Sequence, residues 1–167
     1  SSVLPGSQGG FTELATDGTT AVALGRNGST YFRYTSTDGT TWSSRPPINN
    51  ASAQLATYGG SWFSVSSSGS YTSADGVTWA FAGNSVPSAT FIAGSARGWL
   101  SAGTADINTS ADGLTWVTRS SSTVPPATNH HFAMGGGLIV DATEIGIFTS
   151  PDGLVWAQRF NGNTGKP

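Results

Sequence analysis

The sequence lacks cysteine and has few charged residues, and each shortage excludes a class of function. Without any Cys among its 167 residues, the chain has no disulfide, no thiolate metal site and no cysteine nucleophile. Charged residues make up only 10% of the chain, and the formal net charge is −2. Because no basic run is present to neutralise phosphates, we expect no nucleic-acid partner.

Long apolar runs are missing as well. No stretch of about 18 apolar residues predicts a membrane span, and no signal-peptide pattern is visible. The chain starts at Ser1 without Met, which fits simple Met removal and a processed precursor equally well. Sustained helical periodicity with caps is also absent, so we expect no surface helices.

Glycine and aromatic residues, in contrast, are abundant. The chain contains 23 Gly, 8 Phe, 6 Trp and 4 Tyr, a composition suited to many short strands joined by tight turns. We therefore predict an all-β fold. Low charge combined with many Ser, Thr and Gly residues is also associated with exposed bacterial, fungal or phage proteins, so we expect an extracellular or virion-surface location.

One short pattern recurs four times and organises the chain. Each copy reads Ser, any residue, Asp, Gly, two further residues and Trp, and the four aspartates lie 37, 37 and 40 residues apart. A fixed period of this length is typical of propeller blades and solenoid units. The copies contain Ser36, Asp38, Gly39 and Trp42; Ser73, Asp75, Gly76 and Trp79; Ser110, Asp112, Gly113 and Trp116; and Ser150, Asp152, Gly153 and Trp156.

The chemistry of the pattern favours a turn rather than a binding site. Asp-Gly between two strand-forming runs is a hairpin signal, because Gly adopts positive φ without a Cβ clash. The carboxylate can accept hydrogen bonds from backbone amides of its own turn, and the Ser hydroxyl can add another. The Trp is expected to pack beside the next sheet. A lone carboxylate per copy is a poor calcium or zinc site, so we expect no metal and no cofactor.

The pattern Ser-x-Asp-Gly-x-x-Trp resembles the Asp-box of sialidases and other BNR-repeat β-propellers, shortened by one residue between Asp and Gly. The four matches cover nearly the whole chain. The resemblance implies a structural turn between the outer strands of each blade, away from the catalytic face. It also implies a β-propeller of four four-stranded antiparallel blades, either as a single small ring or as part of a larger ring formed by association.

The repeats divide the chain into segments. We expect an N-terminal arm over residues 1–10, repeats over about 11–47, 52–86, 88–124 and 129–160, and a C-terminal tail over 161–167. In the first repeat the predicted strands are Phe11–Thr16, Thr20–Leu24, Thr30–Thr35 and Thr41–Ser44, with an insertion around Arg26–Ser29. Columns of apolar residues in the first two strands of each repeat should face neighbouring blades and form the core.

Several aromatic residues are candidates for binding a ligand. Tyr58, Trp62, Trp99 and Tyr71 would stack on sugar faces if their rings are exposed. For Trp62 and Trp99 we favour the alternative, a place in the core between blades.

Charged residues supply the other candidates. Arg45, Arg119 and Arg159 each follow a repeat Trp by three residues; we favour protection of the outer strand edge over a ligand or partner contact. Glu13 falls on a predicted innermost strand, and its counterparts are Gln54, Phe91 and His131. We favour a hydrogen-bonded channel residue at this position over a catalyst.

A catalytic site cannot be assembled from these residues. A sialidase-like site would, by resemblance, need an arginine cluster, a Tyr activated by Glu and an Asp acid/base. The chain has two Glu and six Arg, and they do not fall in positions that match such a site. His130 and His131 are adjacent, so on a strand their side chains point to opposite faces and do not chelate together. We therefore expect no catalytic residues and no enzyme activity.

Three functions remain. The first is a structural, decoration or adhesion module of an extracellular or virion (phage-like) surface assembly, with protein partners or further copies of the chain. The second is a carbohydrate-binding lectin or receptor-binding head with glycan ligands, and the third is a reduced sialidase-like glycosidase. The first requires the fewest dedicated residues.

Overall fold

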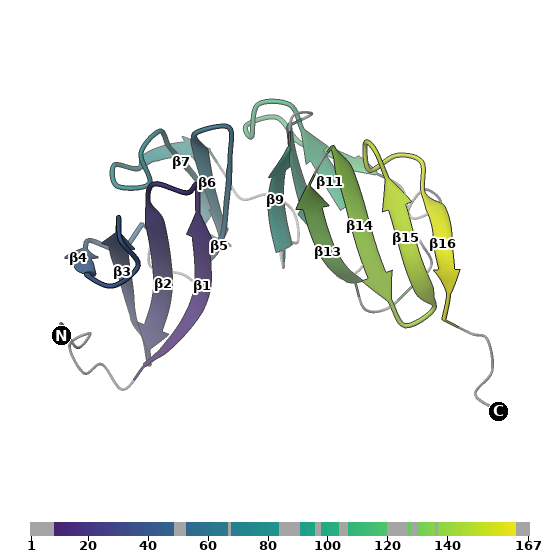
Figure 1. Cartoon of the computed structure of the whole chain (residues 1–167). Helices are drawn as coiled ribbons and strands as arrows, with labels where there is room; N and C mark the ends of the chain where they lie inside the picture. The colour runs from purple at the N-terminus through teal and green to yellow at the C-terminus, as the bar shows by residue number, and fades with distance from the viewer. Residues whose placement is uncertain are drawn as a thin grey trace. The chain divides into compact units, whose positions relative to one another are not determined.

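The computed structural model describes residues 9–48, 53–66, 68–83, 91–95, 98–103, 107–119, 127, 130–135 and 137–162. These residues form four antiparallel sheets of four strands each and no helix (Figure 1). The predicted all-β fold is therefore confirmed. Within each sheet the strands are neighbours in chain order, so every sheet is an up-and-down meander. No apolar helix that could cross a membrane occurs in this part of the chain.

The strand bounds are as follows. The first sheet contains β1 (Gly10–Thr16), β2 (Ala21–Asn27), β3 (Thr30–Ser36) and β4 (Ser43–Arg45). The second contains β5 (Ala53–Tyr58), β6 (Ser61–Ser66), β7 (Gly69–Ser73) and β8 (Ala80–Gly83). The third contains β9 (Phe91–Ser95), β10 (Gly98–Ala102), β11 (Ile107–Ser110) and β12 (Val117–Arg119). The fourth contains β13 (His130–Gly135), β14 (Leu138–Thr143), β15 (Gly146–Ser150) and β16 (Ala157–Asn161).

The insertion in the first repeat lengthens two strands instead of forming a loop. We expected the second strand to end at Leu24, but β2 continues to Asn27, which pairs with Thr30 of β3. The turn is confined to Gly28 and Ser29, and Gly28 has a φ of 57°. The inserted residues extend the ladder because each added pair satisfies further backbone donors and acceptors.

The outermost strand of the first sheet starts later than expected. The prediction placed its beginning at Thr41, whereas β4 begins at Ser43. The backbone amide of Thr41 donates to Asp38 Oδ1 at 2.7 Å, so this residue belongs to the turn and is not available to the ladder. The Asp-Gly connection is therefore longer than a two-residue hairpin.

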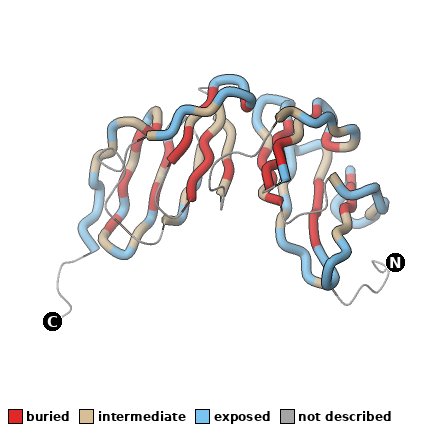
Figure 2. The backbone as a smooth tube through the Cα atoms, turned by 180° about the vertical axis from the view of Figure 1, so that it is seen from behind, coloured by how far each residue is buried: buried red, intermediate tan, exposed pale blue. Residues whose placement is uncertain are grey.

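The chain divides into two compact units, Ser1–Val86 and Pro87–Pro167, each of which holds two sheets. In the first unit, Val22 and Leu24 pack against Leu55 and Trp62 of the second sheet. Buried segments lie mainly on the middle strands, and the loops are mostly exposed (Figure 2). The predicted packing of apolar columns between neighbouring sheets is confirmed in this unit.

The second unit repeats the arrangement with the third and fourth sheets. Strand β9 contacts β13, and Leu100 and Ile107 pack against Ile139.

Several sequence predictions fall outside the described residues. These are residues 1–8 of the expected N-terminal arm, residues 163–167 of the expected tail, and the parts of the expected repeats that fall within residues 84–90 and 120–126. Gly10, placed in the arm, belongs to β1, and Asn161, placed in the tail, belongs to β16.

Candidate functional site

The four Asp-box loops share one internal geometry, shown here by the second copy. Ser73 Oγ donates to Asp75 Oδ1 at 2.9 Å and accepts from the backbone amide of Gly76 at 2.9 Å. Asp75 Oδ1 also accepts from the amides of Val77 and Thr78 at 2.8 and 2.7 Å. The other three copies repeat these bonds. The predicted hydrogen bonding of each Asp to its own turn is confirmed.

The repeated Trp closes the same loop. In the four copies the indole Nε1 donates to the carbonyl of the Asp-box Gly at 3.2, 3.0, 3.1 and 3.3 Å. The Gly has a φ between 72° and 76° in every copy, a region that side chains with Cβ rarely adopt. Ser, Asp, Gly and Trp therefore form one hydrogen-bonded turn.

The carboxylates of these loops are held in the charged form. Backbone amide bonds lower the pKa of Asp38, Asp75 and Asp112, to about 2 for Asp75, because an amide donor stabilises the ionised carboxylate. Among the described residues, no group of three or more His, Asp or Glu is close enough to hold a metal ion.

The loops differ in what covers them. In the second copy Gly76 is buried, and a Cβ placed on it would lie 3.1 Å from Val22 of the first sheet. In the first copy Gly39 is exposed, and a Cβ there would meet nothing within 4 Å. The preceding sheet therefore covers the second loop, whereas the first loop lies open.

Arg33 joins the first sheet to the second loop. This side chain is only 5% exposed, and its Nη1 donates to the carbonyls of Gly76 and Val77 at 3.1 and 2.9 Å. Its Nε donates to the carbonyl of Pro46 at 2.9 Å. A buried guanidinium is stabilised by such acceptors, so Arg33 acts as a clamp between the two sheets.

Asp17 forms a second clamp between these sheets. Its Oδ1 accepts from the amides of Thr19 and Thr20, both at 2.8 Å, and these bonds lower its pKa to about 2. Its Oδ2 accepts from Trp62 Nε1 at 3.2 Å. The turn between β1 and β2 thus fixes the central Trp of the second sheet.

The second unit shows the same contact between a sheet and the next loop. A Cβ on Gly153 would lie 3.4 Å from Leu100 Cδ1 and 3.4 Å from Thr109 Cγ2 of the third sheet. Trp156 packs against the core formed by Leu100 and Ile139.

One side of the first sheet, which no other described strand covers, is an apolar surface that we call the open face. It consists of Phe11, Leu14, Ala23 and Trp42, which line a hollow together with Glu13. Leu14 is 66% exposed and Phe11 is 49% exposed. The counterpart of Leu14 in the second sheet, Leu55, is only 6% exposed because the first sheet covers it.

Aromatic residues stiffen the open face. The ring of Phe11 makes edge contacts with Phe32 and Tyr34, with centroids 5.4 and 6.2 Å apart. Strands β1, β2 and β3 supply these residues, and pairing of Leu14 and Tyr34 with Ala23 places them on one side of the sheet. The face is therefore a preformed apolar surface.

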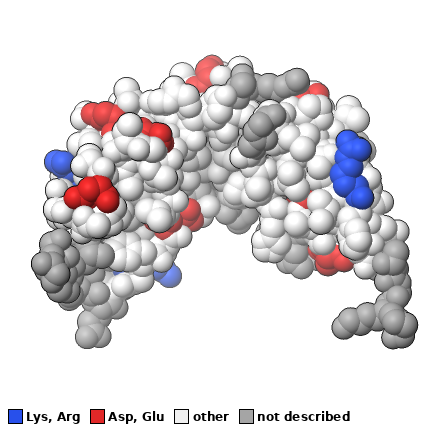
Figure 3. Space-filling view, in the orientation of Figure 1, with Lys and Arg blue, Asp and Glu red and all other residues white. Residues whose placement is uncertain are grey.

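The fourth sheet carries a second exposed apolar surface, which we call the outer face. Its apolar residues are Ala133, Val140, Ala142, Ile147 and Phe160, and His131, Thr149 and Arg159 lie on the same side of the sheet. Strand alternation puts these residues opposite Phe132 and Ile139, which pack toward the third sheet. Ile147 is 40% exposed and Phe160 is 57% exposed. Figure 3 shows a basic patch at the side of the molecule where Figure 1 places β15 and β16, within a surface that is otherwise largely uncharged.

Two of the candidate ligand-binding tryptophans lie in or near the sheet interfaces. Trp62 is fully buried, so the stacking role considered for it is wrong and the core position that we favoured is correct. Its indole belongs to the core cluster that contains Val22 and Leu55, and the side chain has no exposed surface for a ligand. Trp99 is half-buried and lines a pocket with Met134 and Asp152 in the second unit.

Tyr58 and Tyr71 differ in exposure. Tyr58 is 45% exposed at the end of β5, so it keeps an accessible ring. Tyr71 is half-buried and makes an edge contact with Phe81, with centroids 5.4 Å apart.

Glu13 is half-buried between neighbouring strands of the first unit. Burial raises its pKa, and a side-chain hydrogen bond with Gln54 opposes the rise. This arrangement agrees with the hydrogen-bonded residue that we favoured at the position.

The three repeated arginines bind within their own sheets. The Nε atoms of Arg45, Arg119 and Arg159 donate to threonine Oγ1 on the adjacent strand at 3.1, 2.9 and 2.8 Å. The acceptors are Thr35, Thr109 and Thr149. In each of these three sheets the arginine therefore ties the outermost strand to its neighbour. The three guanidinium groups bind three different threonines and share no common partner in these contacts.

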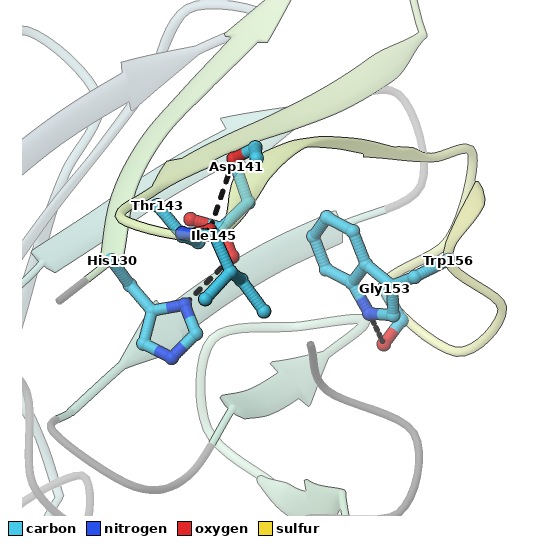
Figure 4. Close-up of polar contacts among 7 residues, drawn as sticks. His130, Asp141, Thr143, Ile145, Gly153 and Trp156 are labelled. Carbon is cyan, nitrogen blue, oxygen red and sulfur yellow. Dashed lines mark hydrogen bonds and ion pairs between the residues drawn. The ribbon is translucent and has the colours of Figure 1, made fainter. Parts of the chain in front are cut away.

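The two histidines point to opposite faces, as predicted. His131 is exposed, whereas His130 Nδ1 lies 2.7 Å from Asp141 Oδ2 and its side chain is 7% exposed (Figure 4). The His130 ring stacks on Phe132 with an interplanar angle of 10°. Asp141 is fully buried, which raises its pKa, while the His130 bond opposes the rise. Its Oδ1 has no hydrogen-bond partner among the residues that the structure describes.

Comparison with known proteins bears on the fold. No protein-family model and no curated protein matches the chain. A solved structure that resembles it is the crystal structure of an ancestral GH74 enzyme, with a TM-score of 0.55 and 19% sequence identity. The match covers 92% of this chain and 24% of that one. The all-β fold thus resembles part of a propeller-type glycoside hydrolase.

Sequence reasoning missed Arg33, Asp17 and Asp141. Arg33 occupies the repeat position that holds Ser70, Ile107 and Ile147 in the later repeats. A charge in an otherwise uncharged column indicates a buried clamp. Asp17-Gly18 has the same Asp-Gly pair as the repeats, which indicates the same amide bonding. No signal in the sequence paired Asp141 with His130.

Proposed function

We propose that the chain is a non-enzymatic run of β-propeller blades that serves as a structural, decoration or adhesion module of an extracellular or virion-surface assembly. The observation that carries this proposal is the open face, where Leu14 is 66% exposed while its buried counterpart Leu55 is 6% exposed. An apolar sheet face of this kind is stabilised when another sheet covers it. The blades thus complete their ring by association with protein partners or further copies.

The candidate acids support a structural role over catalysis. Glu13 is engaged with Gln54, and Asp141 is fully buried against His130. A glycosidase needs two carboxyl groups on either side of a substrate site. The likeness to part of a GH74 enzyme leaves a reduced glycosidase as an alternative, since it concerns the fold and not the residues.

A carbohydrate-binding lectin or receptor-binding head is the second candidate. The exposed ring of Tyr58, 45% accessible beside a Gly-Gly turn, favours it, because aromatic rings stack on sugar faces.

Binding to a broad glycan array, with turnover of fluorogenic sialosides and other glycosides, separates the three functions. We expect neither saturable binding nor turnover. Saturable binding that is lost in Tyr58→Ala and kept in Tyr71→Ala, with both variants folded, would replace the structural proposal with a lectin. Turnover that is lost in Asp141→Asn or Glu13→Gln, with the fold retained, would replace it with a glycosidase.

A further inference from the structure

We propose that Asn27 is a site of spontaneous covalent modification, at which the side-chain amide is lost as ammonia and the residue becomes aspartate or isoaspartate. Asn27 ends β2 and is followed by Gly28 in the exposed turn to β3. Asn-Gly is the dipeptide in which this reaction meets the least hindrance, because Gly places no side chain beside its own backbone nitrogen. The modification is independent of the proposed function.

The reaction needs only water and the two neighbouring residues. The backbone nitrogen of Gly28 gives up its proton and attacks Cγ of Asn27. The new N–Cγ bond closes a succinimide ring, while the Cγ–Nδ2 bond breaks and ammonia leaves after taking up that proton. Water then opens the ring. Cleavage of the N–Cγ bond restores the original backbone and gives aspartate, whereas cleavage of the backbone C–N bond gives isoaspartate, in which the chain runs through Cγ.

The chain contains seven Asn-Gly or Asp-Gly pairs, and they differ in the bond that the Gly nitrogen makes. In each Asp-box the Gly amide donates to the Ser Oγ at 2.8 or 2.9 Å. The amide of Gly18 donates to Thr16 Oγ1 at 3.1 Å, and that of Gly162 donates to the Ile145 carbonyl at 3.0 Å. Such a bond holds the proton that the nitrogen must lose. The amide of Gly28 has no acceptor among the described residues.

The Asp-Gly pairs are protected in a second way. An aspartate closes the same ring by losing water, which requires the protonated carboxyl group. Backbone amide bonds lower the pKa of Asp17, Asp38 and Asp75, so these carboxylates stay charged at neutral pH. The two Asn-Gly pairs are therefore the ones to compare.

These two pairs have opposite surroundings. A Cβ placed on Gly28 would meet nothing within 4 Å, so the turn has room for the ring and for water. A Cβ on Gly162 would lie 3.2 Å from the backbone nitrogen of Gly146, so this glycine is packed against β15. Asn27 and Thr30 form the last pair of the β2–β3 ladder, and a pair at the end of a ladder opens at little cost in free energy. The structure thus singles out Asn27.

The two products change the hairpin differently. Both add a carboxylate, which lowers the formal net charge from −2 by one unit. Isoaspartate also adds one carbon to the backbone after Asn27, so the pair with Thr30 loses its register. The core residues Val22 and Leu24 lie on the same strand before this end, so the sheet should remain folded.

Peptide mapping by mass spectrometry tests the inference on the folded chain, incubated at mildly alkaline pH and sampled over time. We expect the peptide that contains residue 27 to gain the mass difference between a hydroxyl and an amino group, and the chain to become more acidic on ion exchange. Asn27→Gln should abolish the change, because the longer side chain must close a larger ring. Asn161→Gln is the matched control and should leave the rate at residue 27 unchanged.

A chain unfolded in guanidinium chloride separates the effect of structure from that of the dipeptide. Both Asn-Gly pairs then lose their surroundings, so residues 27 and 161 should convert at similar rates. In the folded chain residue 27 should convert at least several-fold faster than residue 161. Equal rates in the folded chain, or no conversion at residue 27, would overturn the inference. A preference for residue 27 that persists unchanged in the unfolded chain would also overturn it, because the surroundings would then not set the rate.

Discussion

The first and second Asp-box loops have the same internal geometry and opposite surroundings. Ser36 and Ser73 donate to their aspartates at 3.0 and 2.9 Å, and the two glycines share a φ of 72°. Yet Gly76 is buried against the first sheet, while Gly39 faces open space.

This comparison separates the geometry of the loop, which its own residues determine, from the burial of the loop, which a neighbouring sheet determines. Hydrogen bonds within seven consecutive residues hold the turn in both loops, so the turn forms without a neighbouring sheet. Burial of the loop comes from the preceding sheet, through Val22 and the Arg33 clamp. The Asp-box turn of a repeat can therefore form where no sheet covers it. The first sheet has such a turn and also presents a face that another sheet can cover.

The largest difference between the first and second sheets is expected when the equivalent leucines, Leu14 and Leu55, are truncated to Ala. Leu55→Ala should lower the free energy of unfolding by about 2–5 kcal/mol, because it leaves a cavity in the core. Leu14→Ala should cost less than about 0.5 kcal/mol in the isolated chain, because its side chain is mostly exposed. Denaturant titration followed by circular dichroism measures both.

Repeating the denaturant titrations at several protein concentrations distinguishes the two leucines further. If the open face binds a second copy, the midpoint of Leu14→Ala should depend on concentration differently from that of the parent chain. The loss in Leu55→Ala should be present at every concentration. Equal losses in the two variants at a concentration where the parent is monomeric would show that the open face is covered within one chain.

Much of the fold was predictable from the sequence because its signals are local and repeated. The Asp-Gly pairs located one turn in each repeat, and the alternating apolar residues around Val22 and Leu55 located the sheet interface. Strand ends were less predictable. The ladder to Asn27 depends on pairing with Thr30, and pairing of inserted residues is not encoded in either strand alone.

The candidate surface was less predictable than the fold. Whether Leu14 or Leu55 is covered depends on which sheet precedes each one in space, and both belong to the same column of the repeat. The Trp62 bond to Asp17 joins residues 45 positions apart, a separation at which the sequence offers no pairing signal. Exposure of Tyr58 likewise became known only from the packed sheets.

A smaller effect is expected from adding one methyl group to each Asp-box glycine. Gly39→Ala and Gly76→Ala both force a positive φ on Ala, so both should lose about 1–2 kcal/mol. Gly76→Ala adds contacts at 3.0 Å to Trp62 and 3.1 Å to Val22, which should raise its loss by about 1–3 kcal/mol through overpacking. Unfolding titrations of the two variants give the difference directly. Identical losses would mean that the first sheet does not press on the second loop.

The smallest effect is expected from acid, and it should be alike in both loops because it arises from their shared local bonds. The pKa of Asp75 is lowered from 3.8 to about 2, and that of Asp38 is lowered as well. A lowered folded-state pKa means that the stabilisation is complete above the unfolded value and is lost as pH falls. The free energy of unfolding should therefore decline between about pH 4 and pH 2.

Asparagine variants assign this decline to the loops. Asp38→Asn and Asp75→Asn cannot ionise, so each should flatten the fall in stability between about pH 4 and pH 2 by a similar amount. Asp17→Asn serves as the matched control outside the Asp-boxes, because its pKa is also lowered to about 2 while its carboxylate additionally holds Trp62. It should flatten the same slope, and it should lower stability at neutral pH more than the two Asp-box variants do, because the bond to Trp62 is weakened as well. A flattening confined to Asp75→Asn would show that the covering sheet, and not the turn, sets the charge state of the carboxylate.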